Sequence, residues 1–129
     1  MKKVWAIFFS FLLLVCFINK TQAMTFEQAF QESNKTPMVV LIYAQWADNY
    51  QNHIAQFRKS QSQLGSIYNY AELDIASNSA KYFNEKFHIY PKLPYVLMFK
   101  NGGKISRYIP RECASDLNCL NSKLKSFIQ

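Results

Sequence analysis

The sequence predicts an α/β fold, in which a central mixed sheet of about four strands is flanked by about four helices. Helical and strand patterns alternate along the chain, which is typical of a sheet covered by helices on both faces. Two continuous apolar runs, at 38–43 and 95–99, have the composition of strands buried on both sides. A turn sequence at 101–103 follows the second run and predicts an antiparallel strand at the sheet edge.

The first helix is predicted from a capping box. Thr25 is followed three residues later by Gln28, so each side chain can hydrogen-bond the other residue's backbone. The segment Lys35-Thr36-Pro37 ends this helix, because proline cannot continue a helical hydrogen-bond ladder. The strand at 38–43 follows it directly.

The middle of the chain predicts a second helix and a second strand. Asp48 or Asn49 can cap the helix, whose amphipathic pattern fades near Ser62. Apolar and polar residues then alternate from 67 to 75, as in a strand.

The last part of the chain predicts a third helix that begins at Ser77 or Asn78, followed by the strand at 95–99. The turn leads into a strand at 104–109. A closing amphipathic helix is indicated by apolar residues at helical spacing: Leu117, Leu120, Leu124, Phe127 and Ile128.

Residues 1–23 have the layout of a secretory signal peptide, with a Lys-Lys start, an apolar stretch at 4–18 and a small-residue site at Ala23. At 1.5 Å per residue the apolar stretch reaches about 22 Å, which is short of a roughly 30 Å hydrocarbon core. We therefore expect cleavage after Ala23, one domain at 24–129 and no stable membrane span after cleavage. The expected location is periplasmic or secreted, with a bacterial periplasm favoured.

The charge balance does not favour nucleic acid as a partner. The whole chain has 15 Lys and Arg against 8 Asp and Glu, a formal net charge of +7. Cleavage would remove Lys2, Lys3 and Lys20, which leaves 12 basic against 8 acidic residues. The remaining basic residues form no block, so no nucleic-acid binding is predicted.

Two of the three cysteines remain after cleavage. Cys16 leaves with the signal peptide, and Val15 before it is bulkier than the small residue that lipid attachment favours. Cys113 and Cys119 lie six residues apart across the predicted start of the last helix, with Ser115 as its N-cap. In an oxidising compartment such a pair usually forms a disulfide. A structural bridge is the favoured interpretation, and a displaced redox pair or unpaired cysteines are the alternatives.

The remaining titratable residues give no catalytic or metal site. His53 and His88 are the only histidines, and neither has a Cys or carboxylate at ligand spacing. We expect both to be surface or half-buried side chains. Glu72 and Asp74 share one strand face and are interpreted as solvated or salt-bridged carboxylates. The sequence predicts no metal and no cofactor.

Three segments, taken in order, resemble proteins of the thioredoxin-like superfamily. Residues 40–46 resemble the strand and Trp that lead into the family's redox loop. Leu93-Pro94-Tyr95 is similar to the segment whose proline is cis and faces that loop, and residues 98–102 are similar to the closing hairpin. The resemblance covers 25–129 and implies a thioredoxin-like fold with a cis peptide bond before Pro94.

The redox motif of that family is missing. Family enzymes follow the Trp with Cys-x-x-Cys, whereas this chain has Ala47, Asp48, Asn49 and Tyr50. Thiol–disulfide exchange requires a thiolate, which neither Ala47 nor Tyr50 can supply. The family's buried Asp, five residues before the Trp, is Leu41 here. The resemblance therefore implies a degenerate site with its frame retained.

The retained frame implies a binding function. In the family, the redox loop and the cis-proline loop border a groove that holds an extended polypeptide. The matching residues here are Trp46 and Tyr50 on one side and Leu93, Pro94 and Tyr95 on the other, and Trp and Tyr are common interface anchors. We predict a non-catalytic exported protein that binds a protein or peptide in the cell envelope. The alternatives are that these aromatic residues only cap the sheet, or that the protein is a thiol-disulfide oxidoreductase using the displaced cysteine pair.

Overall fold

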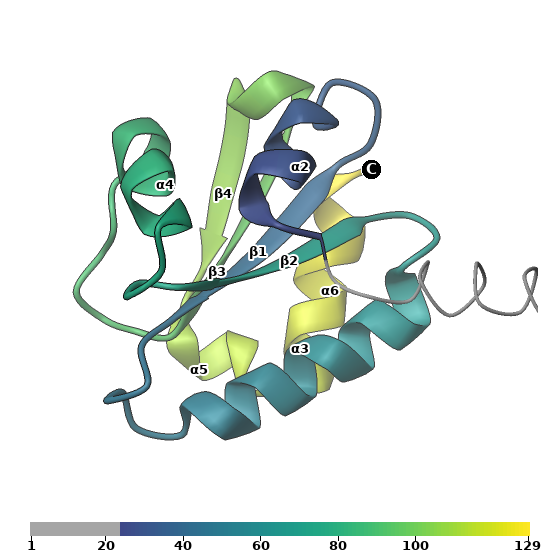
Figure 1. The fold of residues 1–129 in the computed structure, drawn as a ribbon. Helices are drawn as coiled ribbons and strands as arrows, with labels where there is room; N and C mark the ends of the chain where they lie inside the picture. Colours follow the sequence, from purple (N-terminus) through teal and green to yellow (C-terminus); the bar gives the residue numbers. More distant parts are fainter. Residues whose placement is uncertain (1–23) are drawn as a thin grey trace, which may run out of the picture.

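A four-stranded sheet with strand order β2-β1-β3-β4 forms the centre of the structure (Figure 1). The structure is a computed structural model that describes residues 24–129. The predicted signal peptide and its cleavage site at Ala23 lie outside the described residues. In chain order the elements are α2 (Phe26–Gln31), β1 (Met38–Tyr43), α3 (Tyr50–Leu64), β2 (Asn69–Asp74), α4 (Ser79–Phe87), β3 (Tyr95–Lys100), the 3₁₀ helix η1 (Asn101–Gly103), β4 (Ile105–Ile109), α5 (Arg111–Ala114) and α6 (Leu117–Phe127).

The sheet is mixed, which confirms the predicted fold class. β1 pairs in parallel with β2, and Met38 lies opposite Asn69. On its other side β1 is antiparallel to β3, and β3 is antiparallel to β4. Gly102 and Gly103 make the turn between β3 and β4 with φ angles of 68° and 87°, in the left-handed region that favours glycine.

Alternate residues of β1 point to opposite faces of the sheet. Val40 and Ile42 contact α2 and α4, and we call this side the α2/α4 face. Val39 and Leu41 contact α3 and α6 on the opposite side, which we call the α3/α6 face. The continuous apolar run of this strand is therefore explained by burial on both sides.

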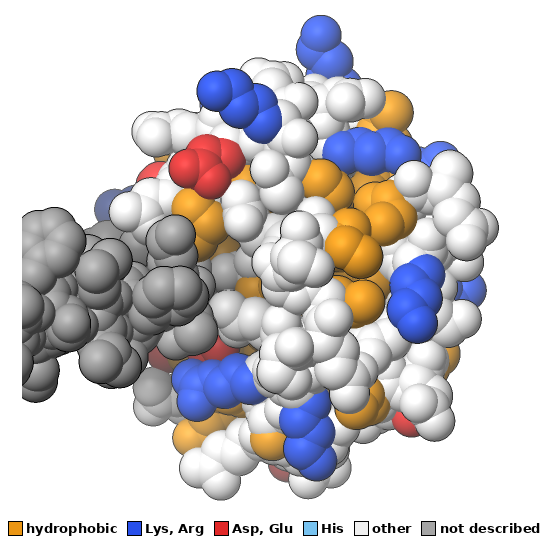
Figure 2. All heavy atoms as spheres, turned by 90° about the vertical axis from the view of Figure 1, so that its right-hand side faces the viewer, with side chains coloured by type: hydrophobic (Ala, Val, Ile, Leu, Met, Phe, Trp, Pro, Cys, Tyr) orange, Lys and Arg blue, Asp and Glu red, His pale blue; other side chains and the backbone are white. Residues whose placement is uncertain are grey.

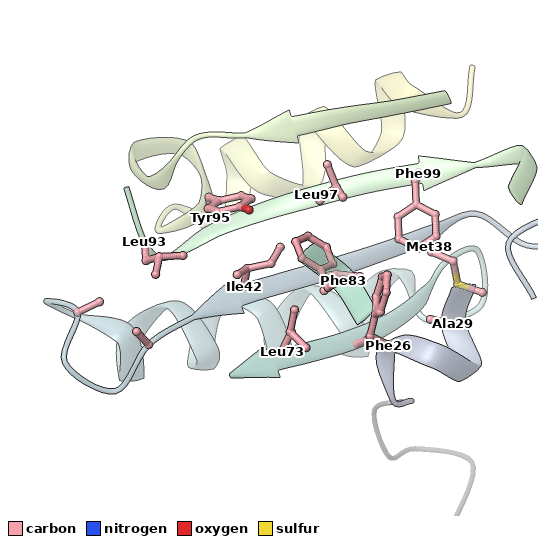
Figure 3. Packing of buried hydrophobic residues seen from close by; sticks show 14 residues of the cluster. Phe26, Ala29, Met38, Ile42, Leu73, Phe83, Leu93, Tyr95, Leu97 and Phe99 are labelled. Atoms are coloured by element: carbon pink, nitrogen blue, oxygen red, sulfur yellow. The ribbon is translucent and has the colours of Figure 1, made fainter. Parts of the chain in front are cut away.

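The core of the α2/α4 face contains a group of aromatic rings among aliphatic side chains. The Phe26 ring lies 5.0 Å from that of Phe83 and 6.1 Å from that of Phe99, measured between ring centroids. Leu93 and Tyr95 lie at one end of this cluster, and Phe99 lies at the other (Figure 3). Such offset and edge-to-face pairs are the arrangements that aromatic rings prefer.

The core of the α3/α6 face also contains buried hydroxyl groups. The Tyr70 and Ser60 hydroxyls are 2.7 Å apart, and Ser60 donates to the side-chain oxygen of Asn121 on α6 at 2.6 Å. The Tyr68 hydroxyl donates to the Leu124 carbonyl at 2.7 Å. These bonds join α3 and β2 to the last helix.

Several predicted boundaries differ from the structure. The capping box of Thr25 and Gln28 is present, but α2 ends at Gln31 rather than near Pro37 because the chain turns at Ser33, whose N–H and hydroxyl both donate to the Phe30 carbonyl. The second strand is shorter than 67–75 at both ends. Ile67 is exposed to solvent and precedes the strand, so its apolar side chain does not indicate a buried strand position.

The start of the last helix also needs correction. A short helix, α5, precedes it and was not predicted from the sequence. The N-cap is Asp116, whose carboxylate accepts from the Asn118 N–H at 3.2 Å, and not Ser115. Ser115 instead donates its hydroxyl to the Glu112 carbonyl at 3.0 Å, as residues at the end of a helical turn often do.

On the face shown in Figure 2, Lys and Arg side chains are separated by hydrophobic and uncharged ones, so they form no continuous basic surface there. Among residues 24–129, no helix is long and apolar enough to span a membrane.

Candidate functional site

The loop after β1 exposes Trp46 and buries Ala47. The Trp46 side chain is 72% exposed, whereas Ala47 is only 7% exposed and packs in the core of the α2/α4 face. The Ala47 N–H donates to the Ala44 carbonyl at 3.0 Å, which closes a tight turn. The loop therefore points a large apolar ring into solvent while its small methyl group fills the core.

The first turn of α3 is held by the backbone of Asn49. Its φ of 60° lies in the left-handed region, which Asn tolerates better than most residues. Asn49, and not the alternative Asp48, is the N-cap, but its side chain makes no capping hydrogen bond. Its carbonyl instead accepts from the His53 N–H at 3.1 Å and faces His53 Nδ1 at 2.9 Å.

Tyr50 stacks on Tyr43 at the exit of β1. Their ring centroids are 6.0 Å apart and the rings are nearly parallel. Burial, together with the negative charge of Asp74, raises the pKa of Tyr43. We call the exposed side chains of Trp46 and Asp48 and the half-buried ring of Tyr50 the loop surface.

The cis-proline loop lies beside the loop surface, but its side chains point into the core. The Leu93–Pro94 peptide bond is cis, as the resemblance implies. Leu93 is 5% exposed, Pro94 is buried and Tyr95 is 1% exposed. The Tyr95 hydroxyl accepts from the Tyr90 N–H at 3.3 Å and lies 3.4 Å from the His88 carbonyl. All three side chains of this loop are therefore buried, and Leu93 and Tyr95 belong to the core of the α2/α4 face.

Cys113 and Cys119 form the predicted disulfide. Their Cα atoms are 5.2 Å apart, within the usual range for a bridge. Cys113 lies in α5 and is buried, whereas Cys119 lies in the first turns of α6 and is half-buried. The bridge joins the short helix to the last one.

His53 is buried, which corrects the expectation of a surface or half-buried side chain. Its Nδ1 lies 2.9 Å from the Asn49 carbonyl and its Nε2 lies 3.2 Å from the Arg111 carbonyl. The spacing of four residues between His53 and the buried Phe57 is the sequence signal that could have revealed this. His88 is exposed, and no group of three or more His, Cys, Asp or Glu within residues 24–129 is placed to hold a metal ion.

Glu72 and Asp74 have structural partners. Arg58 forms two hydrogen bonds of 3.0 Å with Glu72, so Glu72 is salt-bridged as expected. Asp74 accepts from the Ala76 N–H at 2.9 Å and from the Gln45 amide at 3.1 Å. The second bond fixes the base of the loop that carries Trp46.

No family model matches the chain, and no curated protein matches it. Solved structures are similar. One is the thioredoxin Mala s 13 of Malassezia sympodialis, at 19% identity and a TM-score of 0.63, covering 79% of this chain and 84% of that one. Thioredoxin O2 from Arabidopsis thaliana in the oxidised state has 16% identity and a TM-score of 0.62, covering 81% and 87%. The Fasciola hepatica thioredoxin has 17% identity and a TM-score of 0.58, covering 78% and 88%.

The fold is thioredoxin-like. At these identities the similarity concerns the fold alone, and function has to be argued from the residues at the site. The thioredoxin-like frame places Trp46, the start of α3 and the cis-proline loop at one end of the sheet. The positions that follow Trp46 hold Ala47 and Tyr50 instead of cysteines.

Proposed function

We propose that the protein is an exported, non-catalytic thioredoxin-like protein that binds a protein or peptide partner in the cell envelope. The partner is held at the loop surface, beside the cis-proline loop. The observation that carries this proposal is the 72% exposure of Trp46, because Trp is a common interface anchor and a largely exposed indole offers apolar area to a partner.

The arrangement around Trp46 supports binding rather than chemistry. Tyr50 and Tyr43 are stacked, so the aromatic ring next to the helix start is already ordered before a partner arrives. Preordered Tyr and Trp side chains lose little conformational entropy on binding, which favours them as anchors. The cis-proline loop contributes support from the core, since Leu93 and Ala47 belong to the same apolar cluster.

A thiol-disulfide oxidoreductase that uses Cys113 and Cys119 is the second candidate. The bridge between these residues is the observation that favours it. Burial of Cys113 disfavours it, because a redox cysteine has to be reached by its substrate.

The binding test compares capture by the wild-type protein with capture by Trp46→Ala. The protein is expressed from the full chain, purified as processed by the host, immobilised, and exposed to envelope extract. Partners identified by mass spectrometry are then purified and titrated against each variant. We expect Trp46→Ala to weaken binding at least tenfold, a loss of about 1.4 kcal/mol or more.

The matched control is Ile67→Ala, which removes another exposed apolar side chain far along the sequence from the loop. We expect it to bind as the wild type does. Equal binding by Trp46→Ala and wild type would show that the loop surface is not used. Reduction of insulin at an enzyme-like rate, lost in Cys113→Ser, would favour the oxidoreductase instead.

A further inference from the structure

A groove of about 520 Å³ lies between β4 and α6, on the α3/α6 face. Its apolar part includes Ile105 at the edge strand, Phe127 on the last helix and Met98 beneath them. Cys113 of the disulfide also lines it, which places the bridge in its wall. Solvent exposes 37% of Ile105, so this apolar lining is only partly covered.

Three cations border this groove. Lys100, Arg107 and Lys123 line it, and none of the described lining residues is acidic. Lys100 is held in place, because its Nζ donates to the Phe127 carbonyl at 2.9 Å and lies 4.7 Å from the centroid of that ring. Arg107 and Lys123 are exposed. The groove therefore combines an apolar floor with an uncompensated positive rim.

The groove runs along an open edge of the sheet. β4 is the last strand in the order and pairs with β3 on one side only. In an antiparallel pair every second residue of an edge strand directs its N–H and C=O outward. The opposite edge differs, since Met24 pairs with β2 there and its N–H donates to the Tyr70 carbonyl at 3.0 Å.

We propose that this groove binds an extended, acidic segment of another protein, which adds to β4 as a fifth strand. The segment's backbone pairs with the outward groups of β4, as in other cases of strand addition. On the side facing α6, its carboxylates meet Arg107 and Lys123 and its apolar side chains meet Ile105 and Phe127. This surface involves none of the residues of the loop surface, so the inference does not depend on the function proposed above.

The positive charge of the groove favours an acidic segment over a second copy of the chain as its occupant. Pairing two copies through β4 would bring two sets of the three cations together, and like charges near one another destabilise paired strands. A small anionic amphiphile could meet the cations and the apolar floor, but it would leave the outward backbone groups of β4 without partners. An acidic strand meets the three cations, covers the apolar floor and pairs with the outward backbone groups of β4.

The first step of the test selects peptides from a phage-displayed library of random linear peptides on the immobilised protein, expressed from the full chain. We expect enriched sequences in which the alternate residues that share one face of the strand include both Asp or Glu and apolar residues. A synthetic peptide of the enriched sequence is then titrated by fluorescence anisotropy. Arg107→Glu with Lys123→Glu should weaken binding about tenfold or more, because attraction becomes repulsion.

The matched control is Lys104→Glu with Lys125→Glu, which makes the same change in net charge at exposed residues outside the groove. We expect it to change the affinity less than about twofold. N-methylation of the peptide at alternate backbone positions tests strand addition. Methyl groups on the nitrogens that face β4 should abolish binding, and methyl groups on the intervening nitrogens should not.

Failure to enrich acidic sequences would overturn the proposal, as would equal weakening by the two double variants. Tolerance of N-methylation at every position would exclude strand addition. A dimeric mass in solution that Arg107→Glu with Lys123→Glu converts to a monomer would assign the groove to a second copy. Displacement of the selected peptide by oleate at micromolar concentration, with no dependence on N-methylation, would assign it to an amphiphile.

Discussion

The two faces of the sheet are stabilised in different ways. On the α2/α4 face, the buried core cluster consists of apolar and aromatic side chains, and Tyr95 is its only buried member with a polar side chain. On the α3/α6 face, Tyr68 and Tyr70 are buried with their hydroxyls hydrogen-bonded, and a disulfide joins α5 to α6. The stability of the α2/α4 face depends mainly on how well its apolar side chains fit together. The stability of the α3/α6 face also depends on the geometry of its hydrogen bonds.

The comparison shows where the fold tolerates polar atoms. Among the described residues, every buried side-chain N or O atom has a hydrogen-bond partner. Of the three buried polar or charged residues among those described, His53 and Ser60 lie on α3, and Ser33 follows α2. Buried polar groups need such partners because an unpaired one costs about 1–3 kcal/mol. The two faces should consequently respond differently to substitution, to pH and to reduction.

The largest expected loss of stability is on the α2/α4 face. Phe83→Ala removes a ring that is 0% exposed and packs 5.0 Å from Phe26, so it leaves a cavity. We expect a loss of about 3–5 kcal/mol of unfolding free energy, measured by urea titration. Lys81→Ala on the same helix is the control and should change stability by less than about 0.5 kcal/mol. A small effect of Phe83→Ala would mean that the face repacks.

The second effect is a dependence of stability on pH, and it concerns Tyr70 on the α3/α6 face. Burial raises the pKa of Tyr70 to about 12, against an ordinary value of 10. Below pH 10 both states keep the proton, but between pH 10 and 12 the unfolded state loses it first. The unfolded state then binds fewer protons, so stability falls as pH rises, by about 2–3 kcal/mol at pH 12 from this residue.

Urea titrations between pH 8 and 12 measure this fall. Tyr70→Phe removes the titrating group and should reduce the alkaline loss. The control Ser60→Ala removes the hydroxyl that hydrogen-bonds Tyr70 but keeps the burial of Tyr70, so the alkaline loss should persist. An identical pH profile for Tyr70→Phe and wild type would contradict the assignment.

The smallest effect is expected for the disulfide. Cys113→Ala with Cys119→Ala opens a bridge whose cysteines are only six residues apart. The chain-entropy model gives roughly 2 kcal/mol for so short a loop. Because the bridge lies on the α3/α6 face, its loss should add to that of Phe83→Ala without coupling, as distant sites do. Non-additive losses in a combined urea series would show that the two faces are not independent.

Most of the fold was predictable because hydrophobic periodicity reports burial directly. The run at 38–43 matches β1 residue for residue, and the capping box at Thr25 begins α2 as expected. Boundaries set by hydrogen bonds between distant segments were less accessible. Nothing local distinguishes Asp116 from Ser115 as an N-cap, and α5 is too short to show a periodic pattern.

The candidate site was predictable in position but not in exposure. The order of Trp46, Pro94 and the closing hairpin located the loop and the cis-proline segment at the same end of the sheet. Whether a ring faces solvent depends on the segments that pack against it. The burial of Tyr95, whose hydroxyl contacts the Tyr90 N–H and the His88 carbonyl, could therefore not be predicted from the sequence. The groove beside β4 was also missed, because its lining comes from segments whose patterns indicate only core strands and a core helix.

The imidazole of His53 lies between two backbone carbonyl groups and so connects the start of α3 to α5. One belongs to Asn49, at the base of the loop surface, and the other belongs to Arg111, which precedes the bridged cysteine in the groove wall. Any movement that pulls Asn49 away from the imidazole has to be matched by α5 or break one of these contacts. One buried imidazole therefore ties the start of α3, next to Trp46, to the short helix that leads into the groove wall.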